Sequence, residues 1–96
     1  MTDKQLVKYL VDNNDYKYNL LKTAEELQEL SLVLTQMALK EEKVKKQEVI
    51  DEVGDVTIRL KVLKHFFSKR KVKTRIRYKL DKLKSYVTDN KYIGKL

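Results

Sequence analysis

Residues 20–39 read LLKTAEELQELSLVLTQMAL, and this stretch decides the fold class. One set of apolar side chains recurs at helical spacing: Leu20, Ala24, Leu27, Leu34 and Ala38. Such spacing predicts an amphipathic α-helix, here over about residues 17–40. Further leucines, valine and methionine stand on its other faces, and a helix that is apolar nearly all round is buried centrally or shared with a partner subunit.

The rest of the chain also favours helices. It contains no proline and only two glycines, and its commonest residues are good helix formers. Apolar periodicity predicts three more helices, over about residues 2–11, 47–67 and 72–88, with Thr2 as the first N-cap. The breaks fall at 12–15, 40–46 and 68–71, and residues 89–96 are expected to fray. The prediction is all-α: one domain over residues 1–96, an antiparallel bundle of about four helices.

Length and composition limit the function classes. A chain of 96 residues buries a thin core, and without cysteine no disulfide can reinforce it. Oligomerisation is the usual remedy, so we expect a homodimer or homotetramer. The absence of cysteine also excludes thiolate catalysis. No apolar run approaches the roughly 20 residues of a membrane helix, and the N-terminus lacks signal-peptide features, so a cytoplasmic protein is expected.

Two acidic clusters interrupt these apolar helices, EELQE at residues 25–29 and EVGD at residues 52–55. Glu26 and Glu29 are three residues apart, as are Glu52 and Asp55, so each pair projects side by side from its helix. Two antiparallel helices packed at this level would bring four carboxylates together. Like charges cannot share an interior without neutralisation, and an all-oxygen ligand set suits Mg²⁺, with Mn²⁺ as a substitute.

In their order, their spacing and their apolar setting, the two clusters resemble the EExxE…ExxD signature of the MazG-like all-α nucleoside triphosphate pyrophosphohydrolases. EELQE is followed 22 residues later by EVGD, and the second motif continues apolar, as in EVGDVTIRL at residues 52–60. KLDKL at residues 79–83 is similar to the basic segment on the family's last helix. The resemblance covers roughly residues 20–85.

The resemblance implies Mg²⁺-dependent hydrolysis of a (d)NTP to a (d)NMP and pyrophosphate. Glu26, Glu29, Glu52 and Asp55 would hold the metal, and Glu25 would support the site or orient the attacking water. Gly54, between the second pair of ligands, would let a helix or a phosphate approach closely.

Charge is distributed unevenly along the chain. Residues 1–55 hold 8 Lys and Arg against 12 Asp and Glu, whereas residues 56–96 hold 14 against 2. The basic half indicates an anionic partner. On the enzyme interpretation, the candidates for holding the substrate phosphates are Lys79 first, then Lys82, Arg59 and Arg75.

Two other interpretations stay open. A small basic helical protein could bind nucleic acid through its C-terminal helix, for which KRKVKTR at residues 69–75 is suited. It could also be a purely structural helical dimer. The nucleic-acid interpretation gives no reason for the paired carboxylates, whereas a structural dimer could carry them as a degenerate site. Only the enzyme should depend on Mg²⁺ and on Glu52.

Overall fold

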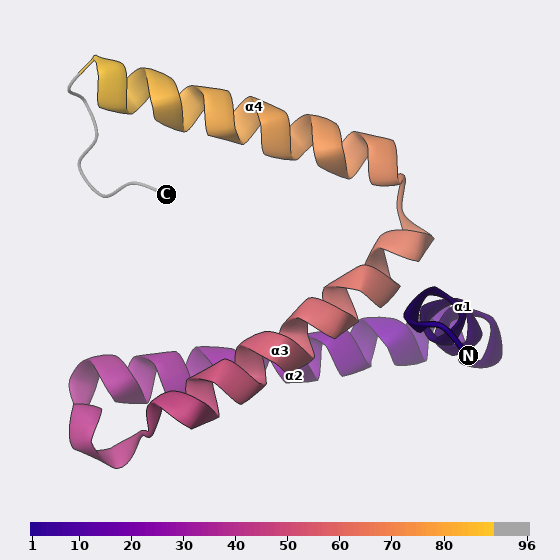
Figure 1. Cartoon of the computed structure of the whole chain (residues 1–96), viewed down its shortest axis with the longest axis horizontal. Coiled ribbons are helices and arrows are strands. Elements are labelled where there is room, and N and C mark those ends of the chain that lie inside the picture. The colour runs from indigo at the N-terminus through magenta and orange to yellow at the C-terminus, as the bar shows by residue number, and fades with distance from the viewer. Residues whose placement is uncertain (90–96) are drawn as a thin grey trace. The chain divides into compact units, whose positions relative to one another are not determined.

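The computed structural model describes residues 1–89, which form four α-helices, two short 3-10 helices and no strand. The α-helices are α1 (Asp3–Asn13), α2 (Tyr16–Leu39), α3 (Lys46–Leu63) and α4 (Lys69–Thr88), and the 3-10 turns η1 (Glu41–Lys43) and η2 (Lys64–Phe66) follow α2 and α3 (Figure 1). The all-α prediction is confirmed. Residues 90–96, expected to fray, lie outside the described residues.

Side-chain caps set the helix starts. The Thr2 hydroxyl accepts from the Gln5 amide while the Gln5 side chain accepts from the Thr2 amide, a capping box that confirms Thr2 as the first N-cap. Asp15 accepts from the Tyr18 amide at 2.6 Å and so begins α2. Ser68 caps α4 by accepting from the Lys71 amide, so α4 begins earlier than the predicted residue 72. The predicted linker over 68–71 was therefore wrong beyond Ser68.

The chain divides into two compact units, Met1–Phe66 and Phe67–Leu96, and each is described by itself. In the first unit, α2 and α3 run antiparallel side by side, joined through η1, and α1 contacts α3 (Figure 1). The second unit contains α4. Within residues 1–89, no helix is both long enough and apolar enough to cross a membrane. The expected dimer or tetramer stays a prediction.

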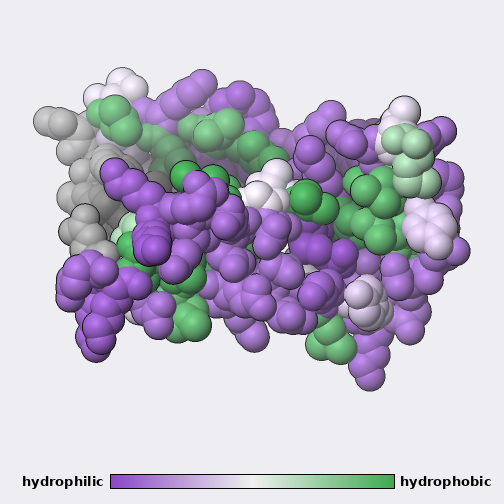
Figure 2. All heavy atoms as spheres, turned by 60° about the horizontal axis from the view of Figure 1, so that its bottom comes forward, coloured by the Kyte–Doolittle hydropathy of each residue, from purple (hydrophilic) through white to green (hydrophobic). Residues whose placement is uncertain are grey.

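The face of α2 that packs on α3 is not the apolar stripe expected from the sequence. Leu27 and Leu34 are 44% and 47% exposed, whereas Asn19 and Thr23 are buried. In the part of the chain that the structure describes, the buried apolar side chains are Val44, Val56 and Val62. Apolar side chains accordingly reach the surface among hydrophilic ones (Figure 2).

The α2 side of the contact repeats with alternating steps of four and three residues. The buried and half-buried residues that follow this spacing are Asn19, Thr23, Glu26, Leu30, Val33 and Met37, and Leu20 and Lys22 are half-buried beside them. On α3 the matching set is Val49, Glu52, Val56, Arg59 and Leu63. This is the heptad spacing of two helices packed along their length, but polar residues occupy one end of it. We call this contact the α2–α3 seam.

Candidate metal centre

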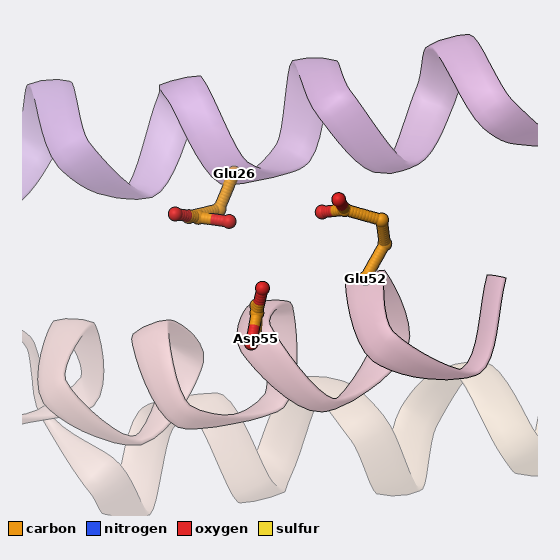
Figure 3. A group of neighbouring side chains, drawn as sticks. All are labelled: Glu26, Glu52 and Asp55. Carbon is orange, nitrogen blue, oxygen red and sulfur yellow. The ribbon is translucent and has the colours of Figure 1, made fainter. Parts of the chain in front are cut away.

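Three carboxylates meet at the α2–α3 seam. Glu26 projects from α2, and Glu52 and Asp55 project from α3, into the space between the two helices (Figure 3). One oxygen from each of the three lies within 4.8 Å of the other two. Glu26 and Glu52 are half-buried and Asp55 is exposed, so the group is open to solvent on the Asp55 side.

These carboxylates are poorly satisfied within the described chain. Glu26 Oε2 and Glu52 Oε2 are both buried and have no hydrogen-bond partner there. The Glu26 side chain is only 13% exposed, and it forms a salt bridge with Lys22, whose Nζ lies 3.5 Å from Glu26 Oε1. One lysine cannot neutralise three carboxylates, and a buried carboxylate oxygen without a partner costs free energy. The cluster therefore favours a cation.

The residues present fit a hard divalent cation. All donors are carboxylate oxygens, which Mg²⁺ and Mn²⁺ prefer. Neighbouring oxygens on one octahedral Mg²⁺ are about 3 Å apart, so the three side chains would have to draw closer together than the 4.8 Å within which their oxygens lie here. The two buried oxygens without partners are the atoms that gain most from such an ion.

The structure does not place Glu29 and Glu25 in this three-residue group. Glu29 is exposed, but it lies close enough for the charges of Glu26, first, and of Glu52 to raise the pKa of its carboxyl, with desolvation adding to the shift. Glu25 is exposed and pairs with Lys22, Nζ to Oε1 at 3.4 Å. The attraction of Glu25, more than that of Glu26, raises the pKa of Lys22. Glu29 is thus a neighbour of the cluster, and Glu25 sits at its edge.

Gly54 lies between Glu52 and Asp55 in the middle of α3. Apart from the adjacent turns of its own helix, a Cβ added there would meet no atom of the described residues within 4 Å. The expectation that a helix approaches Gly54 closely therefore finds no such helix in residues 1–89. The open space leaves the expectation of a phosphate there as a prediction.

The Gly54→Ala substitution is expected to stabilise the protein by about 0.5–1 kcal/mol, because glycine in a helix interior carries an entropic penalty that alanine lacks. Urea unfolding followed by circular dichroism measures the change. The reverse substitution at an exposed position of α2, Ala24→Gly, should destabilise by a similar amount. If Gly54→Ala instead lowers stability, the space above Gly54 is occupied in solution.

Arg59 is the one predicted phosphate-binding residue on the same unit as the carboxylates. It belongs to the seam one helical turn beyond Asp55, and its Nη2 donates to Asn19 Oδ1 at 2.9 Å and to the Asn19 carbonyl oxygen at 3.3 Å. Its Nε is buried and has no partner in the described chain. Asn19, which is 0% exposed, was not among the site residues predicted from the sequence. Its signal was the seven-residue spacing from Asn19 to Glu26, one heptad along the seam.

The other three predicted phosphate-binding residues lie on α4, in the second unit. Arg75 stacks 5.0 Å from the centre of the Tyr78 ring, and Lys82 Nζ lies 5.8 Å from the centre of the Tyr86 ring. Lys79 is half-buried and lines a groove on α4 with Arg75. Their part in phosphate binding stays a prediction.

Comparison with known proteins adds no relative. No family model matches the chain, and neither a curated protein nor a solved structure matches it. The resemblance to MazG-like enzymes rests on the two acidic motifs and their setting.

Proposed function

We propose that this protein is a Mg²⁺-dependent pyrophosphohydrolase of the MazG-like kind, which hydrolyses a (d)NTP to a (d)NMP and pyrophosphate. The observation that carries the proposal is the convergence of Glu26, Glu52 and Asp55 within 4.8 Å, with two buried oxygens unpartnered in the described chain. If these carboxylates belonged to an ordinary solvated helix face, their oxygens would be exposed and would accept hydrogen bonds from water.

The roles proposed for the residues follow from their positions. Glu26, Glu52 and Asp55 would hold Mg²⁺, and Glu29, close enough to feel two of them, would complete the ligand set. Glu25, at the edge of the cluster, would orient the attacking water. Bound Mg²⁺ would neutralise phosphate charge and make a coordinated water more acidic. Water adds to the α-phosphorus and the bond to the β-phosphate oxygen breaks, so one water is consumed for each pyrophosphate released.

Pyrophosphate release from a panel of NTPs and dNTPs tests the proposal. With Mg²⁺ present we expect release from at least one nucleotide, with the monophosphate formed in equal amount and no inorganic phosphate. Excess EDTA should abolish the release, and Mn²⁺ should restore it. Equal amounts of monophosphate and pyrophosphate distinguish this activity from a phosphatase, which would release inorganic phosphate first.

The composition of α4 favours nucleic-acid binding as the alternative function. This helix carries nine Lys and Arg against one Asp. If the folded protein releases pyrophosphate from no nucleotide in the presence of Mg²⁺ or Mn²⁺, the enzyme proposal fails. Salt-dependent binding of DNA that is unaffected by Glu52→Gln would then support the alternative.

A further inference from the structure

Arg59 forms no salt bridge with any described carboxylate, although it lies on the same helix as two of the three clustered ones. Asp55 precedes it by four residues on α3, the spacing at which an aspartate and an arginine commonly pair. Among residues 1–89, however, Arg59 takes part in no salt bridge, and its hydrogen bonds go to Asn19 on α2. The carboxylates stay available for a cation, and within the described chain the guanidinium has no ion-pair partner.

Asn19 can hold Arg59 without neutralising it because the Asn19 side chain is an amide. Its Oδ1 accepts from Arg59 at 2.9 Å, while its Nδ2 donates to the Asp15 carbonyl oxygen at 3.1 Å. A carboxylate at this position could accept from Arg59 but would set its second oxygen against a carbonyl oxygen. An apolar residue would remove the side-chain bonds to Arg59 and to the Asp15 carbonyl oxygen, leaving only the backbone bonds of residue 19 to each of them. Only a neutral side chain with a donor and an acceptor binds both, and it leaves the arginine charge uncompensated.

The position along the seam relates this charge to the metal centre. Arg59 follows Asp55 by one turn, about 6 Å along the helix axis. A positive charge of this kind beside an acidic cluster opposes cation binding unless an anion accompanies the cation. A phosphate chain is such an anion, since it binds Mg²⁺ through some of its oxygens and offers others to an arginine.

We propose that Asn19 and Arg59 form a phosphate-binding arm of the carboxylate site, in which Asn19 is a positioning residue that holds Arg59 uncompensated and Arg59 contacts the phosphate chain. The proposal rests on the proposed function and deepens it, because it assigns the phosphate contact to α3, beside the carboxylates, and to the charge that Asn19 preserves.

The test uses inorganic triphosphate, which contains the phosphate chain without a base, titrated calorimetrically into the Mg²⁺-loaded protein. Arg59→Gln keeps a donor for Asn19 but removes the charge, and we expect it to weaken triphosphate binding by about tenfold to a hundredfold. Arg59→Lys keeps the charge and should retain most of the affinity. Lys61→Gln, the same loss of charge at an exposed position of α3, is the matched control and should bind like the parent.

A second titration separates an electrostatic role from a structural one. With Mn²⁺ alone, Arg59→Gln should bind the ion at least as tightly as the parent, because a positive charge near the carboxylates has gone. Asn19→Asp supplies a counter-charge to Arg59. Like Arg59→Gln, it should weaken triphosphate binding and leave Mn²⁺ binding at least as tight as in the parent. A pair that only holds the helices together would instead lower both affinities in both variants.

Two results overturn the inference. One is triphosphate binding that is equal in the parent and in folded Arg59→Gln, and the other is binding that is equally weak in Arg59→Gln and Arg59→Lys. If Arg59→Gln fails to fold, the arginine Nε–H signals of the parent replace it, since the chain has only four arginines. The Arg59 signal, identified by its loss in Arg59→Lys, should shift when triphosphate binds, and a signal that stays in place contradicts the inference.

Failure of the inference can be distinguished from failure of the proposed function. If the parent binds triphosphate through Arg59 but hydrolyses no nucleotide, the phosphate-binding arm is supported and the proposed enzymatic activity is contradicted. If the parent hydrolyses nucleotides and Arg59→Gln binds triphosphate as tightly as the parent, the enzymatic activity is supported and the arm is contradicted. A metal-loaded parent that does not bind triphosphate contradicts the arm directly.

Discussion

Glu52→Gln is expected to lower the rate of pyrophosphate release by about a thousandfold while the protein stays folded. A bound metal ion contributes several kcal/mol of charge stabilisation to phosphoryl transfer, and each 1.36 kcal/mol is a factor of ten in rate. Glutamine has nearly the shape of glutamate, so the α2–α3 seam is kept while one ligand charge is lost. Initial rates at saturating nucleotide and increasing Mg²⁺ measure the effect.

Asp55→Asn should act in the same way, and the double variant should be little worse than either single one. Residues that act as a unit on one ion are not additive, because the first substitution already removes most of what the ion contributes. Glu48→Gln is the matched control, the same change at an exposed position in the first turn of α3. If Glu48→Gln loses as much activity as Glu52→Gln, the effect belongs to the net charge of the helix and not to the cluster.

Divalent metal is expected to raise the stability of the parent protein substantially. A ligand present at a hundred times its dissociation constant adds about 2.7 kcal/mol to the free energy of unfolding. For a domain of this size, each kcal/mol raises the melting temperature by roughly 4–8 °C. Thermal unfolding of EDTA-treated protein, with and without added Mg²⁺ or Mn²⁺, measures the shift, which should be roughly 10–20 °C.

The Glu26→Gln variant should separate the contribution of bound metal to the free energy of unfolding from the contribution of the fold itself. Without metal, this variant should be more stable than the parent by about 1 kcal/mol, since one of three mutually repelling carboxylates becomes an amide that can donate to the other two. The lost contact with Lys22 is partly exposed and worth little. With metal, the variant should gain much less than the parent. Equal gains in both proteins would mean that the ion binds elsewhere.

The sequence predicted the existence and type of all four α-helices in the described residues, because apolar periodicity and caps act locally. Thr2 is an example, since its cap depends on Gln5 three residues away. The start of α4 was missed by three residues because the capping ability of Ser68 was not recognised. Both results depend on contacts within one turn of helix.

The buried face of α2 was not predicted correctly, and the physical reason lies in the site. Apolar spacing in the sequence predicted that Leu27 and Leu34 are buried, whereas the α2–α3 seam contains Asn19, Thr23 and Glu26. Sites in helical proteins are built from polar residues at core positions, and there the local pattern and the tertiary structure disagree. The disagreement falls at the candidate metal centre.

Glu26, Glu52 and Asp55 were candidates from their spacing alone, because three residues along a helix put two side chains on one side. Spacing on one helix does not fix how far a second helix is shifted along it. The packing of α2 on α3 determined that Glu26 meets Glu52 and Asp55 while Glu29 stays exposed beside them. It also determined that Arg59 bonds to Asn19, forty residues away, and not to Asp55, four residues away.

The sequence by itself determined that this protein is helical, where its helices lie, and that two carboxylate pairs stand on two of them. These properties depend on neighbours within a few residues. The tertiary structure alone decided which face of α2 is buried, which carboxylates meet, and that Arg59 donates to the buried amide of Asn19. Those properties depend on the register of two helices, which is set by the sum of side-chain contacts along the whole seam.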